Sequence, residues 1–496
     1  TMARAKTQIR INKASFLNAV VCPTRGWLTR HSPDTPTEGD RLRMDEGLEI
    51  GCRARSLYSR GCLVDHPTLD IAAEQTKAWM ADKTVPEIFE ATFVVDQYAA
   101  KADILVRSGK EWKLIEVKSG INPNSEYWED LAYTLMVARR AGVKVKSAAL
   151  LLISSDFRPG MDDHDLFLEY EATDDLWEIA EVFEKVSDSI AAAVLGAERP
   201  APKLIFACRS CPHFGQKCIE NNDSDHIFDL PRLSKSLFNK LTNLNVNKIS
   251  KIPKGVTLTP NQDRVRKAVV GGKPSISKIG LALFLRDVEW PAYYLDFETV
   301  KSAIPMFPDV GPHEQIVTQY SLHVCHAPGE VIKHHEFLAD ASRDQRRQLV
   351  EKLLEDLEES GSIIVYSSFE KTMLNSFAKL FPELKKDLQK CVNRLFDLEK
   401  AFREYVYHPG FRGRSSIKVT LPTLVGDTYE GLAIRDGDAA VAKYARMVRG
   451  EITGREAEEV RKNLLAYCKQ DTHGMVRLHH ELVRISRSIK KNGTGK

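Results

Sequence analysis

Two acidic side chains lie two residues apart inside an apolar segment, and this feature constrains the fold most strongly. The segment reads YYLDFET over residues 293–299, with Asp296 and Glu298 as its acids. The apolar residues predict a buried strand over 292–297, on which side chains at positions i and i+2 point to the same face. Two like charges on one face are costly unless a cation lies between them. The pattern therefore predicts a sheet that holds a hard divalent ion, Mg²⁺ or Mn²⁺.

Two later segments supply more acidic residues for the same site. Glu370 follows the apolar run at 363–365, so it lies just past the end of another expected buried strand. Near the end of the sequence, Tyr467 and Asp471 are four residues apart within a segment of helical spacing, which places them on one helix face. A tyrosine one turn before a metal-binding aspartate is suitably placed to orient the water that attacks a phosphodiester.

In their order and spacing these segments resemble the DEDD exonuclease superfamily, in its tyrosine-bearing variant, on an RNase H-like fold. The resemblance implies that two metal ions are held by four carboxylates and that Tyr467 orients the nucleophile; the carboxylates are those of Asp296, Glu298, Glu370 and Asp471. Shorter segments, such as QYSLH at 319–323 and HHEFL at 334–338, look like a bacterial family of uncharacterised proteins. In that family an exonuclease-like domain follows a RecB-like nuclease, and the resemblance extends over nearly the whole chain.

The N-terminal half carries a second acidic pair. Asp103 and Glu116 lie on two expected strands, 102–106 and 112–117, which a turn of sequence SGK at 108–110 joins into a hairpin. The hairpin brings the two carboxylates together, so that they can share a divalent ion. Lys118, on the same strand face as Glu116, would then position water or neutralise the charge that develops on a phosphoryl oxygen.

This second set resembles the PD-(D/E)xK motif of RecB-like and CRISPR-associated exonucleases. By this resemblance Asp103, Glu116 and Lys118 are catalytic, and Glu90, just before the expected strand 91–95, adds a carboxylate near the site. The alternative is a surface hairpin with a cross-strand ion pair, because Glu-x-Lys is a common sequence.

A cysteine cluster follows this region. Three thiolates lie within eleven residues, at Cys208, Cys211 and Cys218. A closed zinc site or a four-iron cluster needs a fourth ligand, for which Cys22 is the first candidate and Cys52 and Cys62 compete. RecB-like nucleases that resemble this chain join one early and three late cysteines around a [4Fe–4S] cluster. The resemblance thus implies a structural [4Fe–4S] cluster on Cys22 and the three later cysteines, with Zn²⁺ as the alternative. The other cysteines, Cys325, Cys391 and Cys468, are expected to be small buried apolar residues.

The chain is too long, at 496 residues, for one ordinary core. We expect an α/β (α+β) protein with a restriction-endonuclease-like PD-(D/E)xK domain at 1–225, a helical connector at 226–285 and an RNase H-like domain at 286–490. Hydrophobic residues make up 43% and charged residues 28%, which is typical of globular proteins. No run of eighteen apolar residues and no apolar signal core occur, so we expect a cytoplasmic protein without a membrane span.

These features favour a divalent-metal-dependent exonuclease that acts on nucleic acid, with DNA favoured over RNA, in a role such as DNA repair or phage defence. The net charge of +3 adds little to this, because local basic patches matter more than the sum. Arg412, Arg414 and Lys418 are candidates for phosphate contacts, with a solvated loop as the alternative. The rival hypothesis is a nucleic-acid-binding scaffold with decayed nuclease sites. It is favoured by Glu370, where the family usually has Asp, and by Gly51 and Thr134, where the relatives often carry His and Gln.

Overall fold

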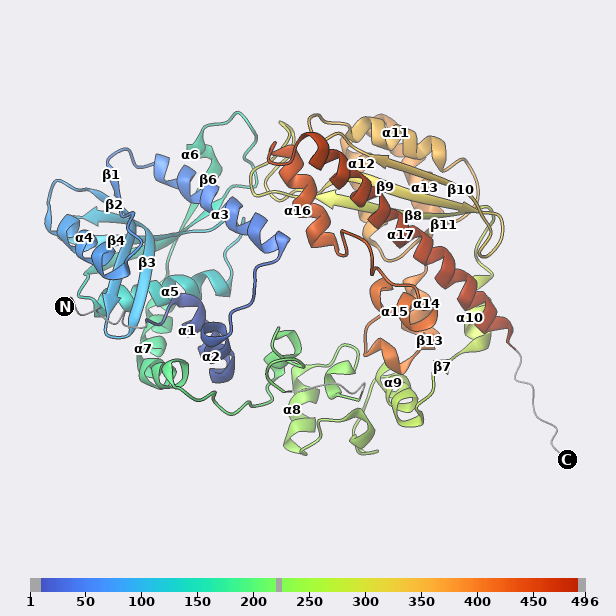
Figure 1. The fold of residues 1–496 in the computed structure, drawn as a ribbon, viewed down its shortest axis with the longest axis horizontal. Coiled ribbons are helices and arrows are strands. Elements are labelled where there is room, and N and C mark those ends of the chain that lie inside the picture. The colour runs from blue at the N-terminus through green and yellow to red at the C-terminus, as the bar shows by residue number, and fades with distance from the viewer. Residues whose placement is uncertain (1–9, 220–224, 489–496) are drawn as a thin grey trace. The chain divides into compact units, whose positions relative to one another are not determined.

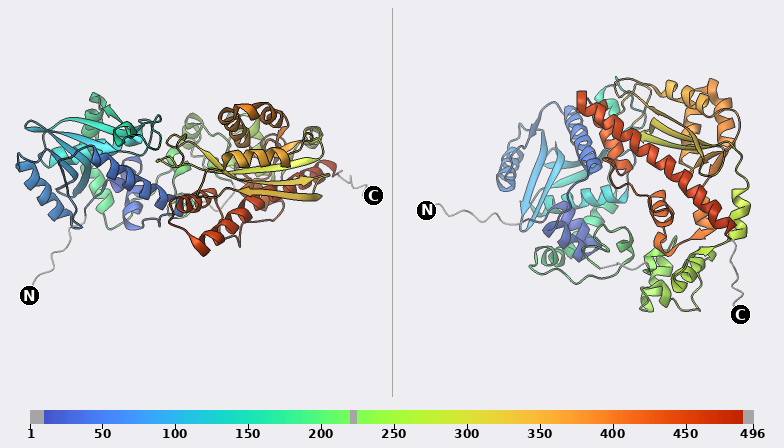
Figure 2. Two further views of the ribbon diagram at one scale, coloured as in Figure 1. Left: turned by 90° about the horizontal axis from the view of Figure 1, so that it is seen from above. Right: turned by 45° about the vertical axis from the view of Figure 1, so that its right-hand side comes forward.

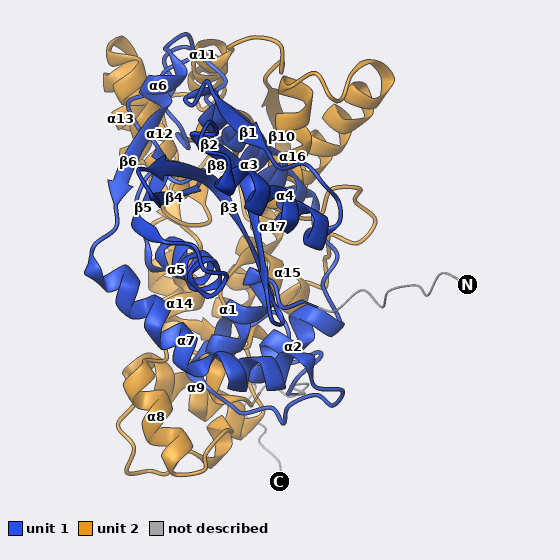
Figure 3. Ribbon diagram, turned by 90° about the vertical axis from the view of Figure 1, so that its left-hand side faces the viewer, with its two compact units in different colours: residues 1–220, 301–314 blue, residues 221–300, 315–496 orange. Residues whose placement is uncertain are grey.

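The computed structural model describes residues 10–219 and 225–488, and it divides into two compact units (Figure 1, Figure 3). Unit 1 comprises Thr1–Glu220 and Lys301–Glu314, and unit 2 comprises Asn221–Val300 and Gln315–Lys496. Each unit contains a mixed sheet with helices packed on it. The predicted α/β class is therefore confirmed.

Unit 1 is built on a six-stranded sheet in which sequential strands lie side by side. Its order is β1 (Gly61–Leu63), β2 (Glu87–Val95), β3 (Tyr98–Ser108), β4 (Glu111–Val117), β5 (Val145–Ile153) and β6 (Phe167–Glu171). The β1–β2 and β4–β5 pairs are parallel and the other pairs are antiparallel. Strands β3 and β4 form the predicted hairpin, and Gly109 adopts a φ of 67° in its turn.

The two faces of this sheet have different neighbours. The helices of unit 1 are α1 (Lys13–Val21), α2 (Pro23–His31), α3 (Glu38–Ser56), α4 (Leu69–Ala81), α5 (Ser125–Arg140), α6 (Asp163–Leu166) and α7 (Asp174–Leu195). Leu114 of β4 shares a buried cluster with residues of α1, α5 and α7, whereas its neighbour Ile115 packs with Ile50 of α3. Side chains alternate along a strand, so Glu116 lies on the same face as Leu114, toward α1 and α5.

Residues 301–314 connect β8 and β9 of unit 2 yet pack within unit 1. Ala303 is buried in the cluster beside α3, and Ser302 Oγ donates a 2.6 Å hydrogen bond to Oε1 of buried Glu46. At the other end of the segment, His313 Nε2 lies 2.5 Å from the carbonyl oxygen of Ser119. The connection between the two strands therefore contributes to the core of unit 1.

Unit 2 contains a five-stranded sheet with the order β10 (Val331–Leu338), β9 (Ile316–Cys325), β8 (Ala292–Val300), β11 (Ile363–Val365) and β12 (Leu395–Asp397). The β10–β9 and β9–β8 pairs are antiparallel, whereas β11 runs parallel to β8 and β12. The acidic strand β8 is thus central and buried on both sides, as its apolar sequence predicts.

Strand β8 presents its two faces to different helices. Tyr293, Leu295 and Phe297 belong to a cluster shared with α11 (Arg346–Asp356), α12 (Phe369–Leu380) and α13 (Lys385–Asn393). The alternate residues face α17 (Gly454–Arg487), the long red helix alongside the sheet in Figure 2. The hydroxyl of Tyr294, for example, lies 2.7 Å from His479 Nδ1 of that helix. The alternation therefore directs Asp296 and Glu298 toward α17.

The remaining elements of unit 2 are short. They are α8 (Lys235–Asn243), α9 (Pro260–Gly271), α10 (Lys278–Leu285), α14 (Glu399–Glu404), α15 (Ile417–Leu424), α16 (Gly437–Val448) and a two-stranded sheet of β7 (Ser275–Ile276) and β13 (Val406–Tyr407). Helices α10, α15 and α16 pack on α17. Among the described residues, none of the helices is long and apolar enough to cross a membrane.

Candidate active sites

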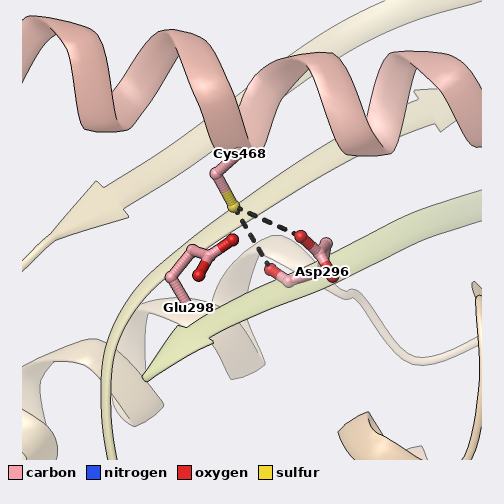
Figure 4. A group of neighbouring side chains, drawn as sticks. All are labelled: Asp296, Glu298 and Cys468. Atoms are coloured by element: carbon pink, nitrogen blue, oxygen red, sulfur yellow. Dashed lines mark hydrogen bonds between the residues drawn. The ribbon is translucent and has the colours of Figure 1, made fainter. Parts of the chain in front are cut away.

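The acidic residues of β8 meet helix α17. Asp296, Glu298 and Cys468 each offer one ligand atom, and these atoms lie within 4.8 Å of one another. In Figure 4 the thiol of Cys468 points from the helix toward the two carboxylates on the strand. Its Sγ lies 3.7 Å from Asp296 Oδ2. Cys468 is buried, as predicted, but it is also a polar neighbour of the acidic pair rather than a purely apolar filler.

One pocket brings most of the predicted residues of this site together. Its walls include four of the five residues predicted for the exonuclease-like site, namely Asp296, Glu298, Tyr467 and Asp471. The fifth, Glu370, lies in the first turn of α12, and only 3% of its surface is exposed. Its charge nevertheless contributes to raising the pKa of Asp296, which places it close to the group.

Burial, with crowding of negative charge added to it, raises the pKa of the carboxyl groups of this site. Burial, and then the charges of Asp471, Glu298 and Glu370, raise the pKa of Asp296 well above its usual value. Burial followed by the charge of Asp471 raises the pKa of Glu298 to about 8. Burial is also the main cause that raises the pKa of Glu370 to about 7 and that of Asp471 to about 6. Carboxyl groups held this close either take up protons or share cations.

Three residues of the same site were not predicted to belong to it. Glu399 and Lys418 line the pocket, and the hydroxyl of Tyr429 donates a hydrogen bond to Asp471 Oδ1. Lys418 Nζ lies 5.2 Å from the ring centroid of Tyr467, and its charge lowers the pKa of both Glu298 and Asp471. The sequence marked Lys418 as a candidate phosphate contact, with a solvated loop as the alternative; Lys418 lies in the first turn of α15, so the loop alternative is wrong for this residue.

The hairpin of unit 1 gathers the second acidic set. Asp103 Oδ2 accepts a 2.7 Å hydrogen bond from the backbone N–H of Val117, and the charge of Glu116 helps to raise the pKa of Asp103. Lys118 Nζ lies 3.1 Å from Glu116 Oε1 and also pairs with Asp130 of α5. The structure thus brings Asp103, Glu116 and Lys118 together and adds Asp130.

A second lysine enters this site from α1. Lys13 Nζ lies 2.5 Å from the same oxygen, Glu116 Oε1, that Lys118 contacts. Although burial acts to raise the pKa of Glu116, the charges of Lys13 and Lys118 lower it. Burial and the charge of Glu116 raise the pKa of Asp103 to about 7.

Neither Glu90 nor Thr134 of unit 1 pairs with Lys13 or Lys118 among the described residues. Glu90 has a φ of 54° within β2, pairs with Arg55 at 3.5 Å, and its charge is among the causes that raise the pKa of Asp103. Thr134 is buried in α5, where its hydroxyl donates to the backbone carbonyl of Asp130 at 3.2 Å. Glu90 therefore lies within electrostatic reach of the acidic pair, and Thr134 satisfies its hydroxyl within its own helix.

Both carboxylate sites contain an acceptor that lacks a partner. Among the residues that the structure describes, Glu116 Oε2 and Glu370 Oε2 are buried and accept no hydrogen bond. A buried carboxylate oxygen without a partner costs free energy, roughly 1–3 kcal/mol or more. A hard cation with oxygen ligands would satisfy both atoms, so the donor sets of both sites fit Mg²⁺ or Mn²⁺.

The four cysteines singled out for a cluster share one small pocket. It is lined by Cys22, Cys208, Cys211 and Cys218, with His213 beside them. Cys52 and Cys62, the competing candidates, do not line it. Burial, followed by the charges of the neighbouring cysteines, raises the pKa of Cys208 and Cys218. Such a thiol set fits a metal centre, because a bound cation favours the thiolate form.

Comparisons with known proteins reach part of the chain. Residues 293–416 match the model of a domain of unknown function, DUF2779. This match includes Asp296, Glu298 and Glu370 but ends before Lys418, Tyr467 and Asp471.

Two curated bacterial proteins are similar over a shorter stretch. The uncharacterised protein MG366 of Mycoplasma genitalium is 28% identical over 222 residues, which cover 40% of this chain and 32% of that protein. The uncharacterised protein UU173 of Ureaplasma parvum is 24% identical over 216 residues, covering 39% of this chain and 31% of that protein. The aligned stretch thus spans about a third of each relative.

Proposed function

We propose that the protein is a divalent-metal-dependent nuclease that hydrolyses phosphodiester bonds of nucleic acid, with DNA favoured over RNA. The observation that carries the proposal is the convergence of four carboxyl groups from β8, α12 and α17; burial raises the pKa of all four, and the charges of their neighbours raise the pKa of Asp296 and Glu298 further. Such a group is unfavourable as a purely structural element, and perturbed carboxyls in a pocket are typical of functional sites. Divalent cations relieve the repulsion.

The principal site is assigned to the tyrosine-bearing DEDD type on an RNase H-like fold, acting exonucleolytically. Mg²⁺ or Mn²⁺, when bound, supplies positive charge to the scissile phosphate. The ligands would be Asp296, Glu298, Glu370 and Asp471. Tyr467 lines the same pocket as Asp471 and forms a hydrogen bond with it, and its hydroxyl would orient the attacking water. Lys418 faces the same pocket and would offset negative charge that develops on the phosphoryl oxygens.

Unit 1 is assigned a second nuclease site of the PD-(D/E)xK type. Asp103 and Glu116 would hold a divalent ion, supported by the unpartnered oxygen of Glu116. Lys118 is held between Glu116 and Asp130, which fixes its ammonium group next to the acidic pair. That position suits a group that orients water or neutralises a phosphoryl oxygen.

The cysteine pocket is proposed to hold a structural [4Fe–4S] cluster, with Zn²⁺ as the alternative. The centre would tie residue 22 to residue 208 and so close most of unit 1 in one loop, which favours the folded state. Iron, acid-labile sulfide and zinc contents of anaerobically purified protein distinguish the two. Cys22→Ser should lose the bound metal, whereas Cys62→Ser, outside the pocket, should retain it.

The nuclease activity is tested with end-labelled single- and double-stranded DNA and RNA in Mn²⁺, Mg²⁺ or EDTA. Wild-type protein is compared with Asp296→Ala, Lys118→Ala and Glu330→Ala, a control that removes an exposed carboxylate. We expect the metal-dependent exonucleolytic cleavage assigned to unit 2 to be lost in Asp296→Ala and kept in Lys118→Ala and Glu330→Ala, and any cleavage that remains in Asp296→Ala to require Lys118. Loss in Lys118→Ala alone would place the chemistry in unit 1. Tight binding of nucleic acid without cleavage under any condition would support the scaffold with decayed sites instead.

A further inference from the structure

Two ammonium groups converge on one oxygen in unit 1. Lys13 Nζ and Lys118 Nζ lie 2.5 Å and 3.1 Å from Glu116 Oε1, while Glu116 Oε2 is buried without a partner among the described residues. A purely structural ion pair would use both oxygens, because an unsatisfied buried acceptor is costly. One ammonium group would balance the single negative charge of Glu116, so the second lysine is not needed for that ion pair.

Lys13 is held in place by the backbone before it. The N–H of Ile11 donates to the carbonyl of Gln97 at 2.7 Å, and the carbonyl of Ile11 accepts from the N–H of Ala99 at 3.0 Å. The same carbonyl accepts a 2.9 Å hydrogen bond from the hydroxyl of Tyr133. Asn12 then caps α1 by accepting from the N–H of Ser15 at 2.9 Å. Lys13, the first residue of α1, is thus directed into the site by fixed main-chain geometry.

The two lysines differ in how strongly they are bound to the protein. Lys118 has two acidic partners, Glu116 and Asp130, whereas Glu116 is the only carboxylate that the described residues place within ion-pair distance of Lys13. The Lys13 side chain is also 25% exposed, whereas that of Glu116 is 3% exposed. Part of the Lys13 side chain is therefore accessible to an anion from solvent.

We propose that Lys13 is a substrate-binding residue of the N-terminal site, contacting a non-bridging oxygen of a nucleic-acid phosphodiester. The inference rests on the proposed function of unit 1 and names how that site engages its substrate. If a divalent ion neutralises Asp103 and Glu116, Lys118 still pairs with Asp130, whereas Lys13 has no further carboxylate partner among the described residues. A compact ammonium group on a flexible stem is well suited to bind a phosphate as a point charge.

The test uses the full chain with Asp296→Ala, so that the C-terminal site is silent, and Ca²⁺ in place of Mg²⁺ to slow turnover. Lys13→Met removes the charge, Lys13→Arg keeps it, and Lys77→Met is a matched control at an exposed lysine of α4. A fluorescent DNA oligonucleotide is titrated at several salt concentrations. We expect Lys13→Met to bind about tenfold more weakly and to lower the salt slope by about one, because one phosphate contact is lost. Lys13→Arg and Lys77→Met should keep the parent affinity.

A local readout separates this role from a general effect on folding or on the other site. Acetylation of lysines by a reagent is followed by mass spectrometry with and without DNA. DNA should protect Lys13 but not Lys77. Unchanged affinity and salt slope in Lys13→Met, or acetylation of Lys13 that DNA does not slow, would overturn the inference while leaving the proposed nuclease function intact. A parent chain that binds no nucleic acid at all would overturn both.

Discussion

The two carboxylate sites differ in how their negative charge is compensated. In unit 1, Glu116 is paired with Lys13 and Lys118, and these charges lower its pKa. In unit 2, Lys418 is the main basic group facing the acids, and the pKa of Asp296, Glu298, Glu370 and Asp471 is raised in every case. In the first site two ammonium groups contact one carboxylate, whereas in the second Lys418 faces several carboxyl groups. The difference leads us to expect the stronger requirement for divalent metal in unit 2.

The largest expected effect is on catalysis at the uncompensated site. Asp296→Asn keeps the shape of the side chain but removes the charge that a cation needs. Losing about 4 kcal/mol of transition-state stabilisation would lower the cleavage rate about 1000-fold. Single-turnover cleavage of labelled DNA in Mn²⁺, measured in a Lys118→Ala background that silences the site proposed in unit 1, tests this. A variant that cleaves at the wild-type rate would show that the acidic pocket does not carry the chemistry.

The stability of metal-free protein should change in opposite directions at the two sites. In EDTA, Asp296→Asn removes like-charge repulsion and should stabilise unit 2 by about 1 kcal/mol. Glu116→Gln should instead destabilise unit 1 by about 1–3 kcal/mol, because Lys13 and Lys118 lose their shared partner. The free energy of unfolding of each unit is measured by chemical denaturation, with hydrogen exchange as the readout for the separate units. If both variants change the free energy of unfolding in the same direction, the contrast between the two sites is wrong.

The pH dependence of stability follows from the raised pKa values in unit 2. A carboxyl whose pKa is higher in the folded than in the unfolded state binds more protons when folded, so its contribution is present at low pH and lost as pH rises. For Glu298, Glu370 and Asp471 the folded pKa values are about 8, 7 and 6. In EDTA the midpoint of thermal unfolding of unit 2 should therefore fall by about 3–6 °C between pH 5 and pH 8.

Saturating Mn²⁺ should weaken or reverse this trend, because the ionised carboxylates bind the cation. Differential scanning calorimetry across this pH range, with and without Mn²⁺, measures the effect. Unfolding of unit 2 that is independent of pH in EDTA would argue against a crowded acidic site.

The smallest expected effect concerns the segment that completes unit 1. Ser302→Ala removes the 2.6 Å hydrogen bond to buried Glu46 and should cost about 1 kcal/mol. Faster hydrogen exchange in α3 without change in α17 would locate the loss within unit 1. If instead exchange rises only in α17, the segment is not part of the N-terminal core.

Much of the fold could be predicted from local patterns. The alternation of β8 placed Asp296 and Glu298 on one face, and the turn at Gly109 fixed the hairpin that joins Asp103 to Glu116. Strands such as β1 and β12 have only three residues each, too few for a period of two to show. The packing of residues 301–314 in unit 1 leaves no local signal either, because it depends on tertiary contacts alone.

The residues of the candidate sites also fall into those that local sequence patterns reveal and those that only tertiary contacts reveal. Residues within motifs, such as Glu116 with Lys118 and Tyr467 with Asp471, could be found by spacing. Lys13, Asp130, Glu399 and Tyr429 could not, because each reaches its site from an element that only the fold brings near. Cys468 was read as apolar for the same reason, since nothing in its neighbours along the chain shows that it faces Asp296.

The central claim, that the carboxylates of unit 2 hold divalent cations, is tested most directly by equilibrium binding of Mn²⁺ followed by electron paramagnetic resonance. Wild-type protein is titrated beside Asp296→Asn and Glu330→Gln, which changes an exposed carboxylate. We predict that wild-type protein and Glu330→Gln bind Mn²⁺ with the same stoichiometry and that Asp296→Asn loses the ions assigned to unit 2. Equal Mn²⁺ binding by wild-type protein and Asp296→Asn, or none by either, would contradict the account.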